Sequence, residues 1–262
     1  MDDLSDKNQQ SIGFMKASFG FCVLILSLGF SLLLIAVSIP RPIAFSAGLL
    51  ALLLLLCASL TAERRILNSL PGRRIVEGDH PRITNLVEGL CLSTGISPPH
   101  IHILPTEGRN VAALGTSANA STLIITTGLL EAATRIELEA VLANRISQIV
   151  MYRTALATVA AATFGLAIGP PSFQTRPFAL ISPKLKRKIG LQVDPSHDFS
   201  GDVAGTGITR YPPGMVEAIE MAENKTVIPE TSPTLDPFWL FPSKSETNRP
   251  SIEARATVLR EM

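Results

Sequence analysis

The first group of residues in this chain that could do chemistry lies in one helical segment, residues 134–150. Asn144 and Gln148 are four positions apart, so a helix stacks them one turn apart on the same side, beside a stripe of apolar residues. Arg145 directly follows Asn144. A guanidinium has no acceptor and keeps its proton at working pH, so Arg145 cannot serve as a general base.

The spacing of these polar residues is that of a zinc-binding helix, which carries His-Glu-x-x-His in five consecutive positions. Here the five residues are Asn144-Arg145-Ile146-Ser147-Gln148. Asn and Gln offer amide oxygens, which suit hard cations better than zinc. A fixed positive charge at Arg145 also opposes a divalent cation. We therefore expect no bound zinc and no zinc-dependent hydrolysis at this helix.

The elements that must position this helix belong to the soluble part of the chain, residues 63–262. A capping box between Thr134 and Glu137 is predicted to start the helix. Its other elements, in chain order, are a helix at 81–95, strands at 100–104, 110–115 and 121–127, and helices near 198–202, at 215–223 and from residue 251. This order predicts an α+β fold rather than a doubly wound sheet.

A second candidate site is the histidine pair His100 and His102, which share one face of the strand predicted at 100–104. Two histidines could bind a metal, but the sequence offers no third ligand nearby. We therefore interpret them as two surface histidines.

The N-terminal quarter of the chain predicts a membrane hairpin. Residues 1–16 form a polar tail, and residues 17–39 contain no charge over roughly 34 Å of helix. After the break at Pro40-Arg41-Pro42, residues 43–62 are again long enough to cross a bilayer. We assign two transmembrane helices to residues 17–62.

The charges near the hairpin predict its orientation. Arg41 is in the turn, whereas four arginines (Arg64, Arg65, Arg73 and Arg74) follow the second span. Basic residues favour the cytoplasmic side, so both ends of the hairpin and the soluble domain are expected in the cytoplasm of an integral membrane protein. The formal net charge of +1 gives no reason to expect nucleic acid as a partner.

The chain after residue 150 contains two further segments of distinct composition. Residues 154–169 are apolar but span only roughly 24 Å, so we expect a short helix that is buried in the domain or dips into the membrane. Residues 225–250 form a loop rich in Pro, Ser and Thr. Its aromatic stretch, Phe238–Phe241, is expected to dock on its own domain rather than on lipid.

From about residue 62 onward, the chain resembles the membrane-bound zinc metallopeptidases of the HtpX and CAAX-prenyl-endopeptidase family. The segment Asn110-Val111-Ala112-Ala113 resembles the family's Asn-Ala-Phe-Ala motif. The other matching segments, in the same order as in the family, are 81–82, 87–91, 94–96, 126–131, 137–143, 202–205, 209–214 and 250–255. The resemblance implies a gluzincin-like metallopeptidase domain that faces the cytoplasm and is tethered by transmembrane helices.

The resemblance also implies a role for each candidate position, and in this chain those roles are lost. The first zinc histidine corresponds to Asn144, the catalytic glutamate to Arg145, and the second histidine to Gln148. The third ligand, a glutamate four residues before Asp202, corresponds to Asp198, and a C-terminal histidine corresponds to Arg249. The family's cofactor is zinc, and this donor set is not expected to hold it. Arg145 could instead pair with Asp198.

Three functional hypotheses follow. The first is a catalytically inactive pseudopeptidase that acts as an adaptor or regulatory partner, for example of an active protease or another membrane protein. In that case an extended peptide could still add to the strand edge at Asn110, Val111, Ala112 and Ala113. The second is an active membrane metalloendopeptidase with unorthodox ligands. The third is a membrane scaffold that binds no peptide. All three include the lipid bilayer as a partner.

Overall fold

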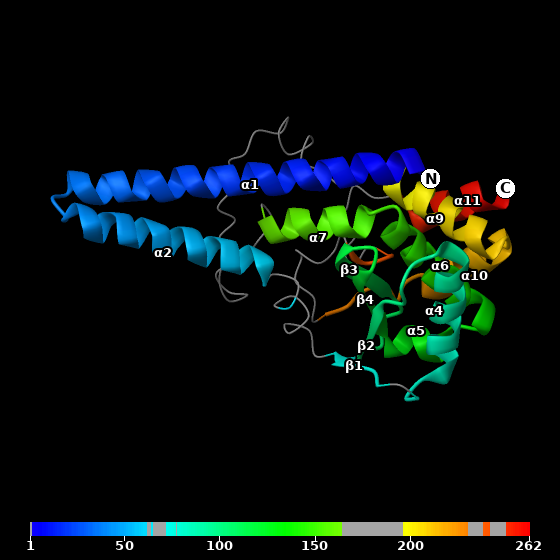
Figure 1. Cartoon of the computed structure of the whole chain (residues 1–262). Coiled ribbons are helices and arrows are strands. Elements are labelled where there is room, and N and C mark those ends of the chain that lie inside the picture. Colours follow the sequence, from blue (N-terminus) through cyan, green and yellow to red (C-terminus); the bar gives the residue numbers. More distant parts are fainter. Residues whose placement is uncertain are drawn as a thin grey trace.

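The computed structural model describes residues 2–61, 64, 72–76, 78–163, 196–229, 238–241 and 250–262, with the side chains of residues 2–3 and 196–197 excepted. A long two-helix hairpin projects from a rounded domain of helices packed on one small sheet (Figure 1). The N-terminus lies beside the domain, close to the C-terminus, because the first helix runs out along the hairpin and the second runs back.

The hairpin consists of α1 (Asp2–Ala36) and α2 (Arg41–Leu60). The helices approach closely at Gly48, where a Cβ atom would lie 1.9 Å from the Ser31 hydroxyl oxygen. The Ser27 hydroxyl donates to the Gly48 carbonyl at 2.6 Å. In a lipid environment the hydrophobic effect does not drive helices together. Small residues and hydrogen bonds from serine side chains, as seen here, are then the contacts that hold two helices together.

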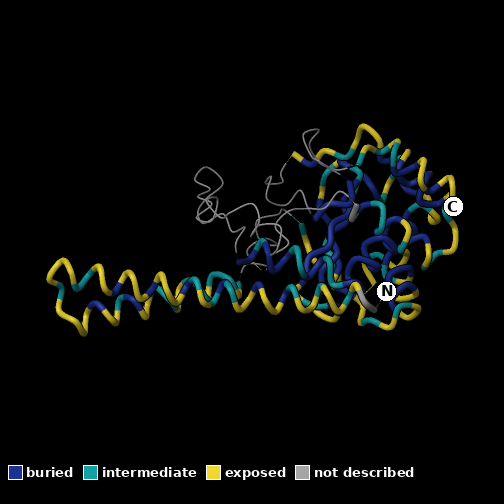
Figure 2. The backbone as a smooth tube through the Cα atoms, turned by 90° about the horizontal axis from the view of Figure 1, so that it is seen from above, coloured by how far each residue is buried: buried dark blue, intermediate teal, exposed yellow. Residues whose placement is uncertain are grey.

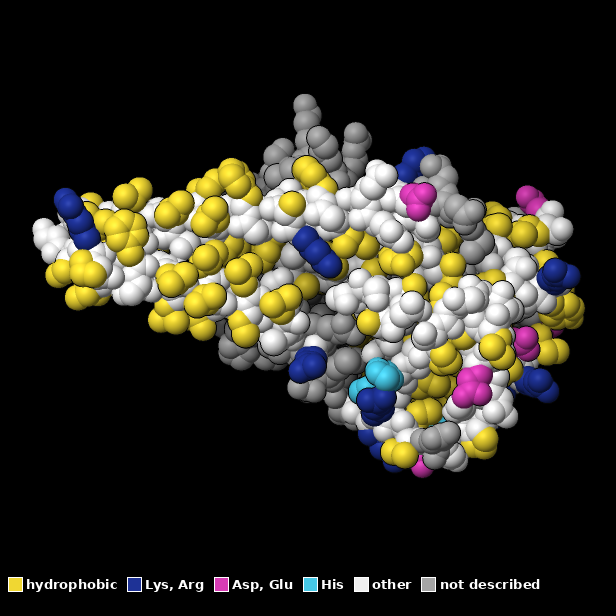
Figure 3. All heavy atoms as spheres, in the orientation of Figure 1, with side chains coloured by type: hydrophobic (Ala, Val, Ile, Leu, Met, Phe, Trp, Pro, Cys, Tyr) yellow, Lys and Arg dark blue, Asp and Glu magenta, His cyan; other side chains and the backbone are white. Residues whose placement is uncertain are grey.

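Both helices are long and apolar enough to cross a membrane. Their outward-facing side chains are mostly hydrophobic (Figure 3). Helix α1 has 35 residues, about 52 Å, and begins at Asp2. The polar segment 1–16, interpreted as a tail, therefore has its residues 2–16 inside the same continuous helix as the first apolar stretch.

Helix α7 (Arg153–Thr163) connects the hairpin to the domain. Its 11 residues rise about 16 Å, half of a bilayer core, and the remainder of the apolar stretch 154–169 lies outside the described residues. One side of α7 packs on α1 in a cluster made of Ile12, Met15, Phe19, Val23, Ala155, Val159 and Ala160. Another side contacts β3, where the Gly115 amide donates to the Thr158 hydroxyl at 3.1 Å.

The sheet has four strands in the order β1-β2-β4-β3. They are β1 (Arg73–Arg74), β2 (His100–Leu104), β3 (Val111–Ser117) and β4 (Ala120–Thr126). Strands β2 and β4 are parallel, whereas β3 and β4 form an antiparallel hairpin. Strand β3 is consequently an edge of the sheet.

The remaining helices pack around this sheet in the domain. They are α4 (Pro81–Thr94), α5 (Thr127–Ala132), α6 (Arg135–Val150), α9 (Ser196–Thr209), α10 (Pro212–Ala222) and α11 (Ile252–Arg260). Helix α4 ends as expected, with Gly95 in the left-handed region at φ 73°. The predicted α+β fold class is confirmed.

Figure 2 shows that the hairpin is largely exposed and that the buried residues are concentrated in the domain. Most of the domain core belongs to α6, β4 and the elements packed on them. Helix α6 is the most central element, since every residue from Ala140 to Ile149 is buried. It contacts β3, α4, α7, α9 and α10. The candidate residues are therefore inside the core.

Candidate functional site

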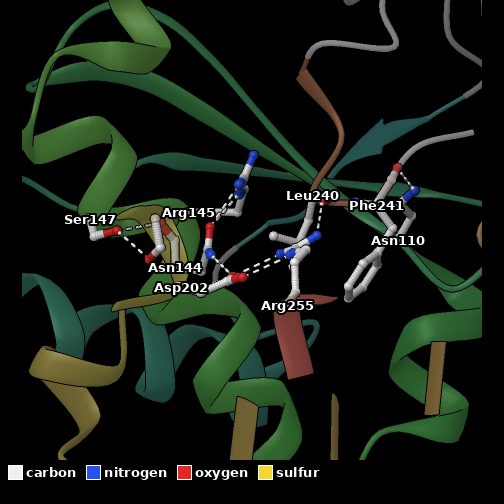
Figure 4. Close-up of polar contacts among 9 residues, drawn as sticks. Asn110, Asn144, Arg145, Ser147, Asp202, Leu240, Phe241 and Arg255 are labelled. Carbon is white, nitrogen blue, oxygen red and sulfur yellow. Dashed lines mark hydrogen bonds and ion pairs between the residues drawn. The ribbon is translucent and has the colours of Figure 1, made fainter. Parts of the chain in front are cut away.

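The polar residues of α6 lie at the centre of the domain. The predicted capping box is present, with the Thr134 amide donating to Glu137 at 2.6 Å and the Glu137 amide donating to Thr134 at 3.3 Å. Asn144 is fully buried, and Arg145 and Gln148 are each 7% exposed. Figure 4 shows their surroundings. Buried polar groups of this kind are tolerated only when each is hydrogen-bonded.

Helix α9 covers this part of α6 at very close range. A Cβ atom at Gly201 would lie 2.0 Å from the Gln148 side-chain nitrogen, and one at Gly205 would lie 2.7 Å from the Asn144 backbone. The absence of side chains at these two positions lets the helices approach with their backbones nearly in contact. The approach brings Asp202, between the two glycines, against Asn144.

Asp202 forms a buried ion pair with Arg255 of α11. Arg255 donates from Nε to Oδ2 and from Nη2 to Oδ1, both at 2.7 Å, and both side chains are at most 2% exposed. Burial alone would lower the pKa of Arg255, but the charge and hydrogen bonds of Asp202, with the charge of Asp198, raise it overall. The pair is bidentate, the geometry in which arginine binds a carboxylate most strongly.

Asn144 links this ion pair to Arg145. Its side-chain nitrogen donates to Asp202 Oδ1 at 2.7 Å, and its oxygen accepts from Arg145 Nη2 at 2.7 Å and Nε at 3.1 Å. Figure 4 shows Arg145, Asn144, Asp202 and Arg255 as one continuous chain of contacts. The site thus contains two guanidinium groups together with the carboxylates of Asp198 and Asp202.

Both ends of this chain reach the segment Phe238–Phe241. Arg145 Nη1 donates to the Phe238 carbonyl at 3.4 Å, and Arg255 Nη1 donates to the Leu240 carbonyl at 3.0 Å. All four residues of the segment are buried, as predicted for docking on its own domain. Sequence reasoning did not connect this segment to the candidate site.

The segment also pairs with the edge of β3. Trp239 forms an antiparallel bridge with Ala112, and the Leu240 amide donates to the Val111 carbonyl at 2.8 Å. The edge at Asn110, Val111, Ala112 and Ala113, predicted as a place for an extended peptide, is fully buried and carries the chain's own residues.

The other predicted residues are distributed as follows. Asp198 is in the first turn of α9, 9% exposed and one turn before Asp202. Arg249 lies outside the described residues. His100 is exposed and His102 is half-buried. The Arg74 guanidinium contacts His100 Nδ1 at 2.7 Å, so these histidines belong to the β1–β2 pair and not to α6.

Arg255 was missed as a site residue, although the sequence contained a signal. It falls on the same side of α11 as Ile252, Ala256 and Leu259, so a charged residue stands within a buried stripe. Such a residue must have a partner of opposite charge.

The described residues do not fit a zinc ion. The Asn144 oxygen already accepts two bonds from Arg145, and both Asp202 oxygens accept from Arg255. Within the described ranges, no three His, Cys, Asp or Glu side chains are grouped as metal ligands would be. A cation at about 4 Å from a guanidinium meets a repulsion of roughly 4 kcal/mol per unit charge at an effective dielectric near 20. A cavity of about 530 Å³ lies elsewhere, between β1, α4 and α5.

Comparison with known proteins finds relatives of one kind. No family model matches it. The Protease HtpX homolog of Dictyoglomus turgidum is 29% identical over 226 residues, which cover 75% of this chain and 74% of the relative. The homologs of Dictyoglomus thermophilum and Tropheryma whipplei (strain Twist) are 27% and 26% identical, covering 72% and 73% of this chain and 72% and 76% of those relatives. Over about three quarters of its length the chain is similar to Protease HtpX homologs, which supports an HtpX-like family.

The HtpX-like relationship agrees with the α+β domain and with the two apolar helices. This HtpX-like chain is therefore a membrane protein with an N-terminal helical hairpin. A shorter match to the Protease HtpX homolog of Pediococcus pentosaceus reaches 38% identity over 88 residues.

Proposed function

We propose that this chain is a membrane-anchored pseudopeptidase, an HtpX-like protein that does not hydrolyse peptides and acts as an adaptor or regulatory partner of another membrane protein. The supporting observation is the closed network of Arg145, Asn144, Asp202 and Arg255. At the position that the family resemblance assigns to zinc and its general base, Arg255 is paired with Asp202, and Arg145 donates to Asn144 and to the Phe238 carbonyl. A network whose carboxylate and amide oxygens already accept from guanidinium groups needs no metal to satisfy them.

The family resemblance also implies that Arg145 stands in place of the catalytic glutamate. A general base must accept a proton from the attacking water, and a guanidinium cannot do so. Arg145 is 7% exposed and donates to Asn144 and to a backbone carbonyl, so its contacts are those of a structural cation.

Two competing functions are distinguished by metal content and by hydrolysis. Purified full-length protein in detergent is incubated with zinc, separated from free metal and analysed for zinc per chain, and casein hydrolysis is measured in parallel. The Protease HtpX homolog of Dictyoglomus turgidum, treated identically, is the positive control. We expect no stoichiometric zinc and no chelator-sensitive hydrolysis. About one zinc per chain, or hydrolysis abolished by Asn144→Ala, would instead establish an active enzyme with unorthodox ligands.

An adaptor and a simple scaffold differ in whether a protein partner is bound. Cross-linking in native membranes followed by purification of the tagged chain is expected to recover a specific membrane protein, such as an active protease. Recovery that is unchanged when Arg145→Ala or Asp202→Ala is introduced would favour the scaffold, because the partner would then not depend on the domain's central network.

We also propose that the domain faces the cytoplasm, on the basis of the arginines that follow α2. In a chain whose native cysteines are replaced by serine, Ser38→Cys places a thiol at the hairpin turn and Leu92→Cys places one on α4, where Leu92 is 84% exposed. A membrane-impermeant maleimide applied to intact cells should label the first and not the second. The opposite pattern would reverse the assignment.

A further inference from the structure

The edge of a β-sheet that faces no other strand exposes unpaired amide and carbonyl groups, and it readily accepts an extended peptide. Strand β3 is such an edge, since β4 pairs with only one of its sides. On its other side, Trp239 bridges Ala112 in the antiparallel sense, and the Leu240 amide donates to the Val111 carbonyl. Residues 238–241 therefore lie where an added peptide strand would lie.

Asn110 holds the end of this segment by its side chain. Its oxygen accepts from the Phe241 amide at 3.1 Å, and its nitrogen donates to the Phe241 carbonyl at 2.9 Å. One amide side chain thus satisfies both backbone groups of Phe241, as a neighbouring strand would. Asn110 is itself fixed, because its backbone exchanges hydrogen bonds with the Thr126 hydroxyl at 3.0 Å and 2.9 Å.

The two arginines of the candidate site hold the segment by its carbonyl groups. Arg145 donates to Phe238 and Arg255 donates to Leu240. Figure 4 shows Arg255 lying between Asp202 and Leu240, with the Phe241 ring beside it. The Arg255 guanidinium carbon lies 5.4 Å from the centroid of that ring, within range of a cation–π interaction. The charged network and the segment are consequently parts of one structure.

The side chains of the segment fill apolar space on both sides of the edge. Phe238 and Trp239 pack with Ala112, Leu114 and Ile124, whereas Leu240 and Phe241 belong to the main core. None of the four is more than 4% exposed. The edge therefore accommodates an extended stretch with large apolar side chains.

We propose that the β3 edge, together with Asn110, Arg145 and Arg255, is a groove for an extended apolar peptide and that residues 238–241 are its resident ligand. This inference rests on the proposed function, because a site that cleaved peptides would not keep one bound in this position. It also specifies how a peptide is held without hydrolysis. Arginine donors bind the carbonyl oxygens, and the strand edge binds the backbone.

The single tryptophan of the chain gives a direct readout of the segment. Trp239 is 1% exposed, so acrylamide should quench its fluorescence weakly in the full-length protein in detergent. Asn110→Asp replaces the donor that faces the Phe241 carbonyl by an acceptor, and we expect quenching to increase several-fold. Asn119→Asp, in the exposed β3–β4 turn, is the matched control and should leave quenching unchanged.

A second variant tests the same contact from the segment. Leu240→Pro removes the amide hydrogen that the Val111 carbonyl accepts, without altering any groove residue. Helical circular dichroism and the thermal transition show whether either variant remains folded. A folded variant of either kind in which Trp239 stays protected would overturn the proposal. The proposal would also be overturned if Trp239 of the wild-type protein became easier to quench on dilution, since the bound segment would then come from a second copy.

The ligand class is tested with a labelled synthetic peptide, Asp-Pro-Phe-Trp-Leu-Phe-Pro-Ser, which reproduces residues 236–243. In Phe241→Ala the resident segment is weakened, and we expect the peptide to bind at least about tenfold more tightly than to wild type, about 1.4 kcal/mol. A peptide with N-methyl-leucine, which lacks the amide hydrogen, should not bind. Equal binding of both peptides would contradict strand addition.

These outcomes are separable from those for the proposed function. Stoichiometric zinc with Trp239 still protected would reject the pseudopeptidase and retain the bound segment. Exposed Trp239 without zinc or hydrolysis would reject the resident ligand and leave the pseudopeptidase in place.

Discussion

Single residues at the candidate site neutralise one another's charge. Arg255 and Asp202 form a bidentate pair that is almost fully buried, and Asn144 connects the pair to Arg145. Removal of one member of such a pair leaves the other as an uncompensated charge in the protein interior. The network is therefore expected to be more important for stability than its few hydrogen bonds suggest.

Replacing Arg255 tests this balance. Arg255→Met should lower the free energy of unfolding by about 3–5 kcal/mol, because Asp202 would remain buried with its charge uncompensated. The control is Arg260→Met on the same helix, since Arg260 pairs with Glu220 at the surface with 59% of its side chain exposed. Its loss should cost at most about 1 kcal/mol. Similar melting temperatures for the two variants in detergent would contradict a stabilising role for the buried pair.

His102 provides a pH-dependent contribution away from the site. Its burial, and then the charges of Arg74 and His100, lower its pKa below the usual 6.5. Below about pH 6.5 the unfolded chain therefore binds a proton that the folded chain does not. The free energy of unfolding consequently decreases as the pH is lowered. In His102→Gln, the decrease in stability between about pH 7.5 and 5.5 should be smaller than in the wild-type protein. Thermal unfolding curves with the same pH slope as wild type would show that His102 contributes nothing.

Single elements are positioned by small residues at their crossings. Gly205 of α9 faces the Asn144 backbone, and Gly48 of α2 faces Ser27 and Ser31 of α1. At both positions a Cβ atom would overlap the neighbouring helix, so the distance between helix axes depends on glycine. This spacing brings Asp202 within hydrogen-bond distance of Asn144.

Gly205→Ala should therefore separate α9 from α6. Its Cβ would lie 2.7 Å from Asn144 backbone atoms, which cannot rotate away as a side chain could. We expect a loss of about 1–3 kcal/mol. Gly207→Ala, where nothing lies within 4 Å, should instead gain up to about 1 kcal/mol from helix propensity. The measurement is the melting temperature, which should be lower in Gly205→Ala than in Gly207→Ala. Equal shifts in the two variants would contradict a close crossing of α9 and α6 at Gly205.

In the whole molecule, the long helix α1 and the short helix α7 connect the hairpin to the domain. Met15 is fully buried in the cluster between them, and α7 in turn contacts β3, the strand that carries residues 238–241. A continuous path of packed residues thus runs from the membrane helices to the candidate groove.

Met15→Ala tests this connection. Truncation of a fully buried methionine should cost about 2–5 kcal/mol. Phe14→Ala removes a larger side chain that is 49% exposed, and it is the matched control, with little expected change in the domain. The readout is the thermal transition followed by Trp239 fluorescence, which reports on the domain. If the domain melts at the wild-type temperature in Met15→Ala, the hairpin and the domain are energetically independent.

The sequence by itself determined the local features. The capping box at Thr134, the left-handed Gly95 and the apolar stripes each depend on residues within one or two turns of one another, so periodicity and cap residues predict them. The hairpin helices were predictable for the same reason, although α1 extends back to Asp2 because polar residues 2–16 also favour a helix that packs on α7.

Only the tertiary structure decided which distant groups meet. Asp202 and Arg255 are 53 positions apart, and Arg145 and Phe238 are 93 apart. A sequence pattern shows that a buried charge needs a partner, but it does not choose among the oppositely charged residues of the chain. That choice follows from how closely α9 approaches α6 and from the segment that pairs with β3. The same approach explains why Asn144 and Arg145, polar residues in a buried stripe, are satisfied by the protein itself.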